Sequence, residues 1–277
     1  MNVLSKLIKM IQEIPWGINN LKSTSITSIL FHSIGYLRGL YLLTRFEKDL
    51  RKASQINLRT LREIIKVNSE SEFGRKYGFS TLDLNQNDAT YKSTVPLHKY
   101  SDFEPAIETI RKGGRNVLCS EPVEFFSASS GTTGLGKTIP TTKRLRNALT
   151  RAYVDLTNAV PATQIPGAAA PFRGLYMGSA ATRIHYTEAG IPVGSASSES
   201  LSRVRRIAPL LWSSPWPVFL VADTTSQWYL HALFALQEPN LKYLRATFAG
   251  HLTGWLAFIF ENQADLINNI ALGTLNL

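Results

Sequence analysis

Cysteine is nearly absent from this 277-residue chain, which has a single one, Cys119. An internal disulfide needs two cysteines, so a disulfide-stapled fold is excluded, as is a nucleophilic cysteine with a resolving cysteine beside it. Cys119 follows Val117 and Leu118 in a short apolar segment. We therefore expect it to be a small core residue rather than a reactive thiol.

The sequence also lacks the spacings that mark metal centres and serine hydrolases. Its histidines lie far apart, and none has the H-x-x-x-H spacing of a helical metal site. No G-x-S-x-G segment occurs, so a nucleophile elbow is absent as well. We expect structural roles for all five histidines: His32, His98, His185, His231 and His251.

No long uninterrupted hydrophobic run is present. The apolar stretch SILFHSIGYLRGLYLL at residues 28–43 contains His32, Arg38 and two glycines, and it is too short to span a bilayer core of about 30 Å. The opening residues, MNVLSKLIKMIQEIPWG, are amphipathic and lack the apolar core and cleavage site of a secretory signal. We expect a cytoplasmic protein without a membrane span, in which residues 28–43 dock against the body of the protein.

Acidic residues are scarce relative to basic ones, which gives a formal net charge of +10. Such an excess favours an anionic partner: nucleic acid, an acidic membrane surface or a nucleotide. The Lys and Arg residues are scattered, and the two densest groups, within 143–151 and 203–206, are not interleaved with aromatic residues as in single-strand binders. We therefore expect no nucleic-acid partner and favour a small anionic ligand.

The order of elements predicts an α/β fold. The sequence shows no fixed-period repeat, and strand-like runs alternate with amphipathic stretches, which is typical of layered α/β domains. Expected helices lie at 42–67, within 91–114, and at 141–160, 224–236 and 254–273. Expected strands lie at 116–121, 123–128, 173–179, 217–223 and 241–250.

The segment SASSGTTGLGKTIPTT, residues 127–142, can be aligned with a Walker A loop through Gly131, Gly136, Lys137 and Thr138. The run VFLVAD ending at Asp223 would then be the Walker B strand. A Walker A loop needs a helix that begins at its Gly-Lys-Thr, but β-branched residues and Pro140 follow Lys137 here. We instead predict strand, loop, short strand, turn and helix, with Thr141–Thr142 as the helix cap. A P-loop NTPase stays open as the less favoured alternative.

The same segment is also a loop rich in hydroxyls and glycines. Its backbone N–H groups and hydroxyls can donate to phosphate oxygens, the glycines allow close approach, and a lysine adds a point charge. A solvated Ser/Gly turn is the structural alternative. The residues expected to bind the triphosphate of ATP are Ser129, Ser130, Gly131, Thr132, Thr133, Gly134 and Lys137.

Several blocks together resemble the GH3 family of acyl acid–amido synthetases, which are adenylate-forming enzymes. These blocks are RFEKDLRKAS with LREIIKVNSESEFGRKYGF, the segment VPLHKYSDFEPAIETIRKGGRNVLCSEPVEFFSASSGTTGLGKTIPTT, and three later ones: GIPVGSASS, SSPWPVFLVADTTSQWYLHALFAL and LKYLRATFAG. The resemblance covers residues 45–277, which it identifies as the N-terminal portion of an adenylate-forming large domain, truncated relative to the family. Residues 1–44 are expected to be a helical extension. Gly136 stands where the family usually has a proline.

The resemblance implies a two-step reaction. A carboxylate attacks the α-phosphorus of ATP to give an acyl-AMP, and the amine of an amino acid then attacks the acyl carbon. Mg²⁺ would neutralise the phosphates, but the family's glutamate for that ion and its mobile C-terminal domain have no counterpart up to Leu277. We therefore expect this chain to be a fragment that is inactive alone. The alternative is a truncated, catalytically inactive protein that binds a nucleotide or a partner.

The acyl acid is expected to contact two elements: the helix expected at 141–160, after the loop, and the strand expected at 241–250. Arg151 is a candidate for the carboxylate because a guanidinium fork matches that group, although a solvent-facing arginine is the alternative. Tyr153, Thr247 and Phe248 are further pocket candidates, each with plain packing as its alternative. Asp223 is expected to cap a helix rather than to act in catalysis.

Overall fold

The computed structural model describes residues 25–84, 87–129, 136–181 and 184–273. The chain forms two compact units, each built from segments distant in sequence. The first, which we call unit 1, contains the described parts of Met1–Leu42, Leu156–Thr182 and Ser197–Leu277. Unit 2 contains Leu43–Asp155 and Arg183–Ala196.

The first described helices are α3 (Ile26–Leu50) and α4 (Ala53–Val67). The prediction of one helix over 42–67 was wrong, because the chain turns between Leu50 and Ala53. Lys52 precedes α4 without a side-chain cap. Since apolar residues keep three- and four-residue spacings on both sides of the turn, periodicity alone does not reveal it.

The stretch at 28–43 was expected to be too short to span a bilayer, but it lies within the 25-residue helix α3. By length and composition this helix could cross a membrane, and only 11% of its most apolar window is buried. One face is nevertheless docked within unit 1. The Ser28 hydroxyl donates to the Pro171 carbonyl at 3.0 Å, and His32 Nε2 lies 3.1 Å from the Leu210 carbonyl oxygen. The opposite face is exposed, so the docking predicted for residues 28–43 is seen for one side of the helix.

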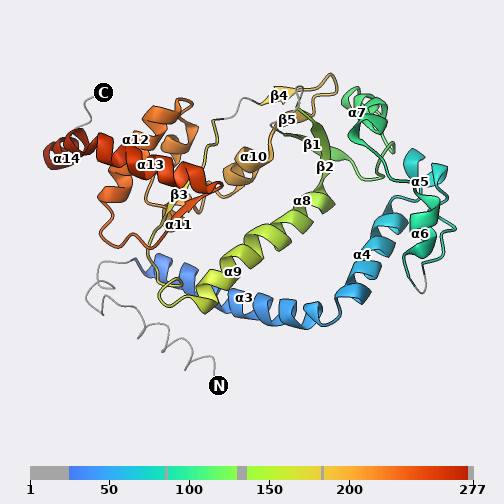
Figure 1. The fold of residues 1–277 in the computed structure, drawn as a ribbon, viewed down its shortest axis with the longest axis horizontal. Helices are drawn as coiled ribbons and strands as arrows, with labels where there is room; N and C mark the ends of the chain where they lie inside the picture. Colours follow the sequence, from blue (N-terminus) through green and yellow to red (C-terminus); the bar gives the residue numbers. More distant parts are fainter. Residues whose placement is uncertain (1–24, 85–86, 130–135, 182–183, 274–277) are drawn as a thin grey trace. The chain divides into compact units, whose positions relative to one another are not determined.

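Unit 2 is built around a four-stranded mixed sheet of β1 (Val123–Ala128), β2 (Thr138–Thr142), β4 (His185–Tyr186) and β5 (Pro192–Ser195). The strand order is β2-β1-β5-β4, with β1 parallel to β5 and the other pairs antiparallel (Figure 1). Phe126 of β1 packs in a core cluster with Ile107 and Ile110 of α7 (Glu104–Arg111). The strand expected at 116–121 is irregular chain instead.

Unit 2 also contains the short elements α5 (Glu72–Lys76), α6 (Ala89–Thr94) and the 3₁₀ turn η1 (Tyr100–Asp102). Helices α5 and α6 pack against a second core cluster of Ile65, Phe79 and Leu84, whereas Tyr100 of η1 packs against the first cluster. The hydroxyl of Ser71 caps α5 by accepting from Gly74 N at 2.9 Å. A Cβ at Gly74 would lie 2.0 Å from the Asn68 carbonyl oxygen, so the tight turn into α5 requires glycine.

The helix expected at 141–160 is present but is not regular. It consists of α8 (Lys143–Leu149), a π-helical segment η2 (Thr150–Asp155) and α9 (Leu156–Gln164). The Thr142 hydroxyl accepts from Leu145 N at 3.3 Å, which confirms the predicted cap. The apolar spacing predicted the helix but gave no sign of the π-helical turn.

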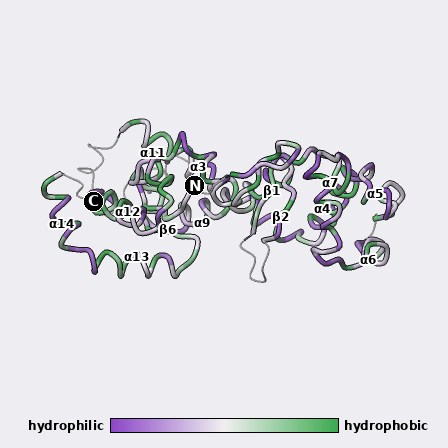
Figure 2. Tube along the Cα trace, turned by 90° about the horizontal axis from the view of Figure 1, so that it is seen from above, coloured by the Kyte–Doolittle hydropathy of each residue, from purple (hydrophilic) through white to green (hydrophobic). Residues whose placement is uncertain are grey.

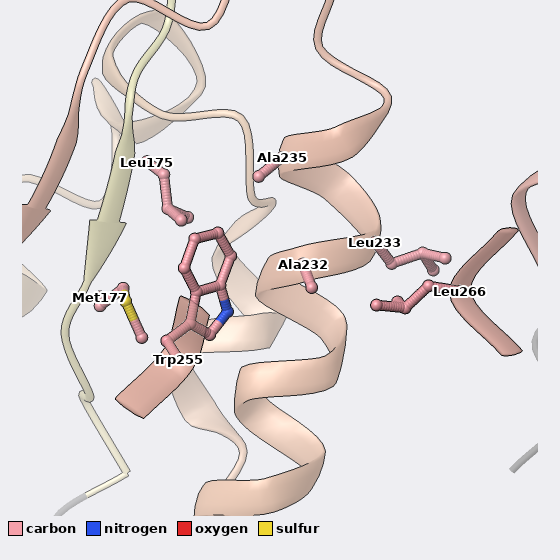
Figure 3. Close-up of a cluster of buried hydrophobic side chains, with 7 residues drawn as sticks. All are labelled: Leu175, Met177, Ala232, Leu233, Ala235, Trp255 and Leu266. Atoms are coloured by element: carbon pink, nitrogen blue, oxygen red, sulfur yellow. The ribbon is translucent and has the colours of Figure 1, made fainter. Parts of the chain in front are cut away.

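Unit 1 has a two-stranded parallel sheet of β3 (Leu175–Met177) and β6 (Leu244–Ala246), packed against α12 (Thr224–Leu236). Figure 3 shows the Trp255 indole between β3 and α12, with Leu233 on the other side of α12 pointing toward Leu266. The indole N–H of Trp255 donates to the Trp228 carbonyl at 3.0 Å. A single hydrophobic cluster therefore joins β3 and β6 to α12 and to the two helices that contain Trp255 and Leu266.

Two further predictions for unit 1 were wrong. Residues 217–223 were expected to form a buried strand, but the chain forms a 3₁₀ turn, η3 (Trp216–Leu220). Residues 254–273 were expected to form one helix, but α13 (Ala249–Glu261) and α14 (Gln263–Leu272) are separated by a turn at Asn262. Apolar residues extend along α13 (Figure 2), including the unbroken run at 256–260, and Trp255 is its buried residue. Helices α10 (Ala196–Arg203) and α11 (Ala208–Leu211) are the remaining elements described.

Candidate functional site

The hydroxyl-rich loop joins the antiparallel strands β1 and β2 of unit 2. Ala128 pairs with Thr138 across the two strands, and Ser129 N donates to the Lys137 carbonyl at 2.9 Å. This hydrogen bond closes the base of the loop. The five expected phosphate-binding residues between these ends lie outside the described residues: Ser130, Gly131, Thr132, Thr133 and Gly134.

The chain after Lys137 decides against a Walker A loop. Strand β2 begins at Thr138, and the next helix begins only at Lys143. The order strand, loop, short strand and helix is the one predicted. The proposed Walker B strand fails too, because Asp223 follows a 3₁₀ turn and caps α12 by accepting from Ser226 N at 2.7 Å. That cap was also predicted.

Lys137 is the basic side chain best placed to meet an anion at this loop. It is exposed, and among the described residues no carboxylate pairs with it. By contrast, Arg144 of α8 pairs with Glu63 at 3.1 Å, and Arg146 pairs with Glu124. Part of the basic cluster after the loop is therefore neutralised by neighbouring glutamates, whereas Lys137 has no carboxylate partner in the part of the chain that is described.

The acyl-pocket candidates fall in two places. Arg151 and Tyr153 lie on the π-helical segment of unit 2. Arg151 is exposed, and its Nε lies 3.4 Å from the Asn147 carbonyl oxygen. Thr247 and Phe248 lie in unit 1 between β6 and α13, and both are exposed. π-Helical turns occur often at functional sites, which supports a role for the segment that carries Arg151.

Sequence reasoning missed an apolar pocket of about 830 Å³ in unit 2. Its lining includes the rings of Phe73, Tyr91, Tyr100 and Phe103 as well as Thr138 and its two successors in β2. Because these residues come from separate short elements, no periodic pattern in the sequence marks them. The pocket matters here because β2, one of its walls, is also one end of the hydroxyl-rich loop.

Titratable groups elsewhere in the described residues do not form a second reaction centre. His231 Nδ1 lies 2.7 Å from the Ser214 hydroxyl, and burial lowers the pKa of His231 to about 4. No group of three His, Cys, Asp or Glu residues able to hold a metal ion occurs in the part of the chain that is described. Cys119 is half-buried, and burial raises the pKa of its thiol, so the reactive thiolate is disfavoured.

The fold is the mixed α/β fold of acyl acid amido synthetases. A solved structure of GH3.15 acyl acid amido synthetase matches with a TM-score of 0.71 and 26% identity, covering 84% of this chain and 41% of that chain. A structure of AtGH3.15 in complex with 2,4-DB matches with a TM-score of 0.70 and 24% identity, covering 86% and 41%.

Sequence comparison then gives the family. The GH3 family N-terminal domain matches residues 42–277, so the chain belongs to the GH3 family. Indole-3-acetic acid-amido synthetase GH3.3 of Arabidopsis thaliana is 26% identical over 261 residues, which are 91% of this chain and 43% of that protein. Jasmonoyl--L-amino acid synthetase GH3.5 of Oryza sativa subsp. japonica is 33% identical over 114 residues, 40% of this chain and 19% of that protein. The chain spans less than half the length of the curated relatives it matches.

Proposed function

We propose that this chain carries the ATP-phosphate-binding part of an acyl acid–amido synthetase. The reaction is adenylation of a carboxylic acid, followed by amide formation with an amino acid. The observation that carries the proposal is the β1–β2 hairpin, whose loop ends at Ser129 and Lys137 and which is followed by a helix only at Lys143. Among the described residues, Lys137 forms no ion pair with a carboxylate. Because a strand rather than a helix follows Lys137, a loop that wraps phosphates is favoured over a Walker A loop.

The proposed phosphate site uses two kinds of groups. Backbone N–H groups and hydroxyls of Ser129, Ser130, Gly131, Thr132, Thr133 and Gly134 would donate to the β- and γ-phosphate oxygens of ATP. Lys137 would add a positive charge, which stabilises a polyanion most where no carboxylate competes. ATP supplies the activated α-phosphorus, and these residues bind and orient its tail.

Mg²⁺ is proposed to enter with the nucleotide. The described residues contain no cluster of ligands able to hold a metal ion, so the phosphates themselves would be the main ligands here. Lys137 and the magnesium ion would then share the neutralisation of the triphosphate.

For the acyl acid, we propose Arg151 as the group that meets the carboxylate. Its guanidinium has no carboxylate partner among the described residues, and the π-helical turn holds it on the helix that follows the loop. Tyr153, Thr247 and Phe248 remain proposed contacts of the acyl group. The second substrate is an amino acid, and the proposed location is the cytoplasm, without a membrane span or a nucleic-acid partner.

We also propose that residues 45–277 form the N-terminal part of the adenylation domain and residues 1–44 a helical extension. Residues 26–44 of the proposed extension lie in helix α3, which continues to Leu50. The family match begins at residue 42, close to the proposed boundary.

Calorimetric titration of this chain with ATP, AMP and adenosine tests the phosphate site. Affinity is expected to rise with the number of phosphates, and equal affinity for adenosine and ATP would contradict the proposal. ATP–pyrophosphate exchange by the protein purified from its natural source, with a panel of carboxylic acids, tests the chemistry. Exchange should depend on the acid, and exchange that proceeds equally without one would argue against adenylation.

A further inference from the structure

Strand β2 is the edge strand of its sheet, so half of its backbone groups face away from β1. Opposite residues in an antiparallel pair alternate between hydrogen-bonded and non-hydrogen-bonded positions. The bond from Ser129 N to the Lys137 carbonyl makes 129/137 a hydrogen-bonded position, so the next pair, Ala128 and Thr138, is not one. The N–H and C=O of Thr138 therefore point outward, toward the open edge.

One side chain satisfies both of these edge groups. Thr138 N donates to the Tyr100 hydroxyl oxygen at 3.0 Å, and that hydroxyl donates to the Thr138 carbonyl at 3.2 Å. The next outward position of β2 is Pro140, which has no N–H to satisfy. The Tyr100 hydroxyl thus takes the place of a neighbouring strand at the residue where β2 begins.

The ring of the same tyrosine lies beside the loop lysine. Lys137 Nζ is 5.6 Å from the centroid of the Tyr100 ring, within the range of a cation–π contact. Tyr100 is itself held by its turn, because Lys99 N donates to Asp102 Oδ2 at 2.8 Å across η1. One residue from a distant turn therefore contacts both the side chain of Lys137 and the backbone of the residue after it.

We propose that Tyr100 is a positioning residue, which holds Lys137, at the base of the hydroxyl-rich loop, in the geometry that receives the ATP phosphates. This inference rests on the proposed function of the loop. Its hydroxyl fixes the start of β2, and its ring restricts the Lys137 ammonium at the mouth of the loop. Tyr100 does not touch the nucleotide in this role and acts through Lys137.

The test is the affinity of the 277-residue chain for ATP and for inorganic tripolyphosphate, measured by calorimetry. Tyr100→Phe keeps the ring and removes both hydrogen bonds, so affinity for each ligand is expected to fall about fivefold. Tyr100→Leu removes the ring as well and should weaken binding further. Tyr91→Phe is the matched control, because Tyr91 lines the same pocket and its hydroxyl forms no hydrogen bond with the described residues. Its effect should stay below about twofold.

A double-mutant cycle separates positioning from a general structural effect. In a Lys137→Ala background, Tyr100→Phe should have a much smaller effect on tripolyphosphate affinity than in the wild type, because the group it positions is gone. An unchanged fivefold loss in that background would overturn the inference. So would a Tyr100→Phe chain that binds like the wild type while Lys137→Ala binds weakly. If the wild-type chain is folded and binds neither ligand, the proposed function of the loop fails, and the role of Tyr100 fails with it.

Discussion

Ser129 and Lys137 are joined by a backbone hydrogen bond of 2.9 Å that brings the two ends of the hydroxyl-rich loop together. The bond continues the β1–β2 ladder to Ser129 and Lys137, so the two described ends of the loop are paired. Lys137 consequently stands at a fixed end of the loop with its ammonium exposed.

Replacing Lys137 by alanine should lower the affinity of the chain for ATP about tenfold, because a charge-assisted contact to phosphate is lost. Calorimetric titration measures the change. Lys143→Ala is the control, since Lys143 is also exposed but begins α8 beyond β2. Equal losses for the two variants would indicate that only net charge matters.

Gly74→Ala should lower the free energy of unfolding by about 3 kcal/mol, because the added Cβ would clash with backbone oxygens of Asn68 and Ser69. Thermal unfolding followed by circular dichroism measures this loss. At Gly35, in α3, a Cβ meets no atom within 4 Å. Gly35→Ala should therefore stabilise the chain by up to about 1 kcal/mol. A Gly74→Ala protein as stable as the wild type would refute the turn geometry.

The stability of the chain should fall as the pH is lowered from 6.5 to 4. Burial lowers the pKa of His231 to about 4, whereas in the unfolded chain the same group binds its proton near its ordinary pKa of 6.5. The unfolded state therefore binds more protons in this window, and protonation favours it by up to about 3 kcal/mol. His32 has a pKa lowered to about 4, chiefly by burial, and contributes in the same direction.

Urea unfolding at several pH values checks this. His231→Gln should flatten the pH dependence between 6.5 and 4, whereas His251→Gln, at an exposed position, should leave it unchanged. A wild-type slope retained by His231→Gln would show that His231 is not the group responsible.

The last two helices expose large apolar side chains. Phe260 of α13 is 72% exposed, and Ile267 of α14 is 66% exposed. Apolar surface of this kind binds the dye 8-anilinonaphthalene-1-sulfonate, so the double variant Phe260→Ser, Ile267→Ser should reduce dye fluorescence with little change in thermal stability. Dye fluorescence that stays at the wild-type level would place the binding surface elsewhere.

The sequence predicted those elements that are determined by neighbouring residues, such as a helix cap or a proline. Thr142 and Asp223 each carry a capping oxygen directly before a helical pattern, and both helices begin where these caps lie. The run TIPTT predicted a strand after Lys137, because proline and β-branched residues disfavour a helix there.

What the sequence did not predict depends on contacts between distant segments. The turn at Arg51–Lys52 interrupts no apolar spacing, and the apolar run at 216–220 suits a strand as well as a 3₁₀ turn. The two hydrogen bonds between the Tyr100 hydroxyl and the backbone of Thr138 join a turn to an edge strand 38 residues away, and no local sequence pattern marks them. The pocket beside this strand was missed for the same reason.

The central claim is that the loop between Ser129 and Lys137 receives the phosphates of ATP. Hydrogen exchange of the backbone amides, measured by mass spectrometry with and without Mg·ATP, tests it most directly. The account predicts that Mg·ATP slows exchange in peptides covering 129–138 and that adenosine does not. Protection by Mg·ATP that appears in other segments, with exchange in 129–138 unchanged, would contradict the account.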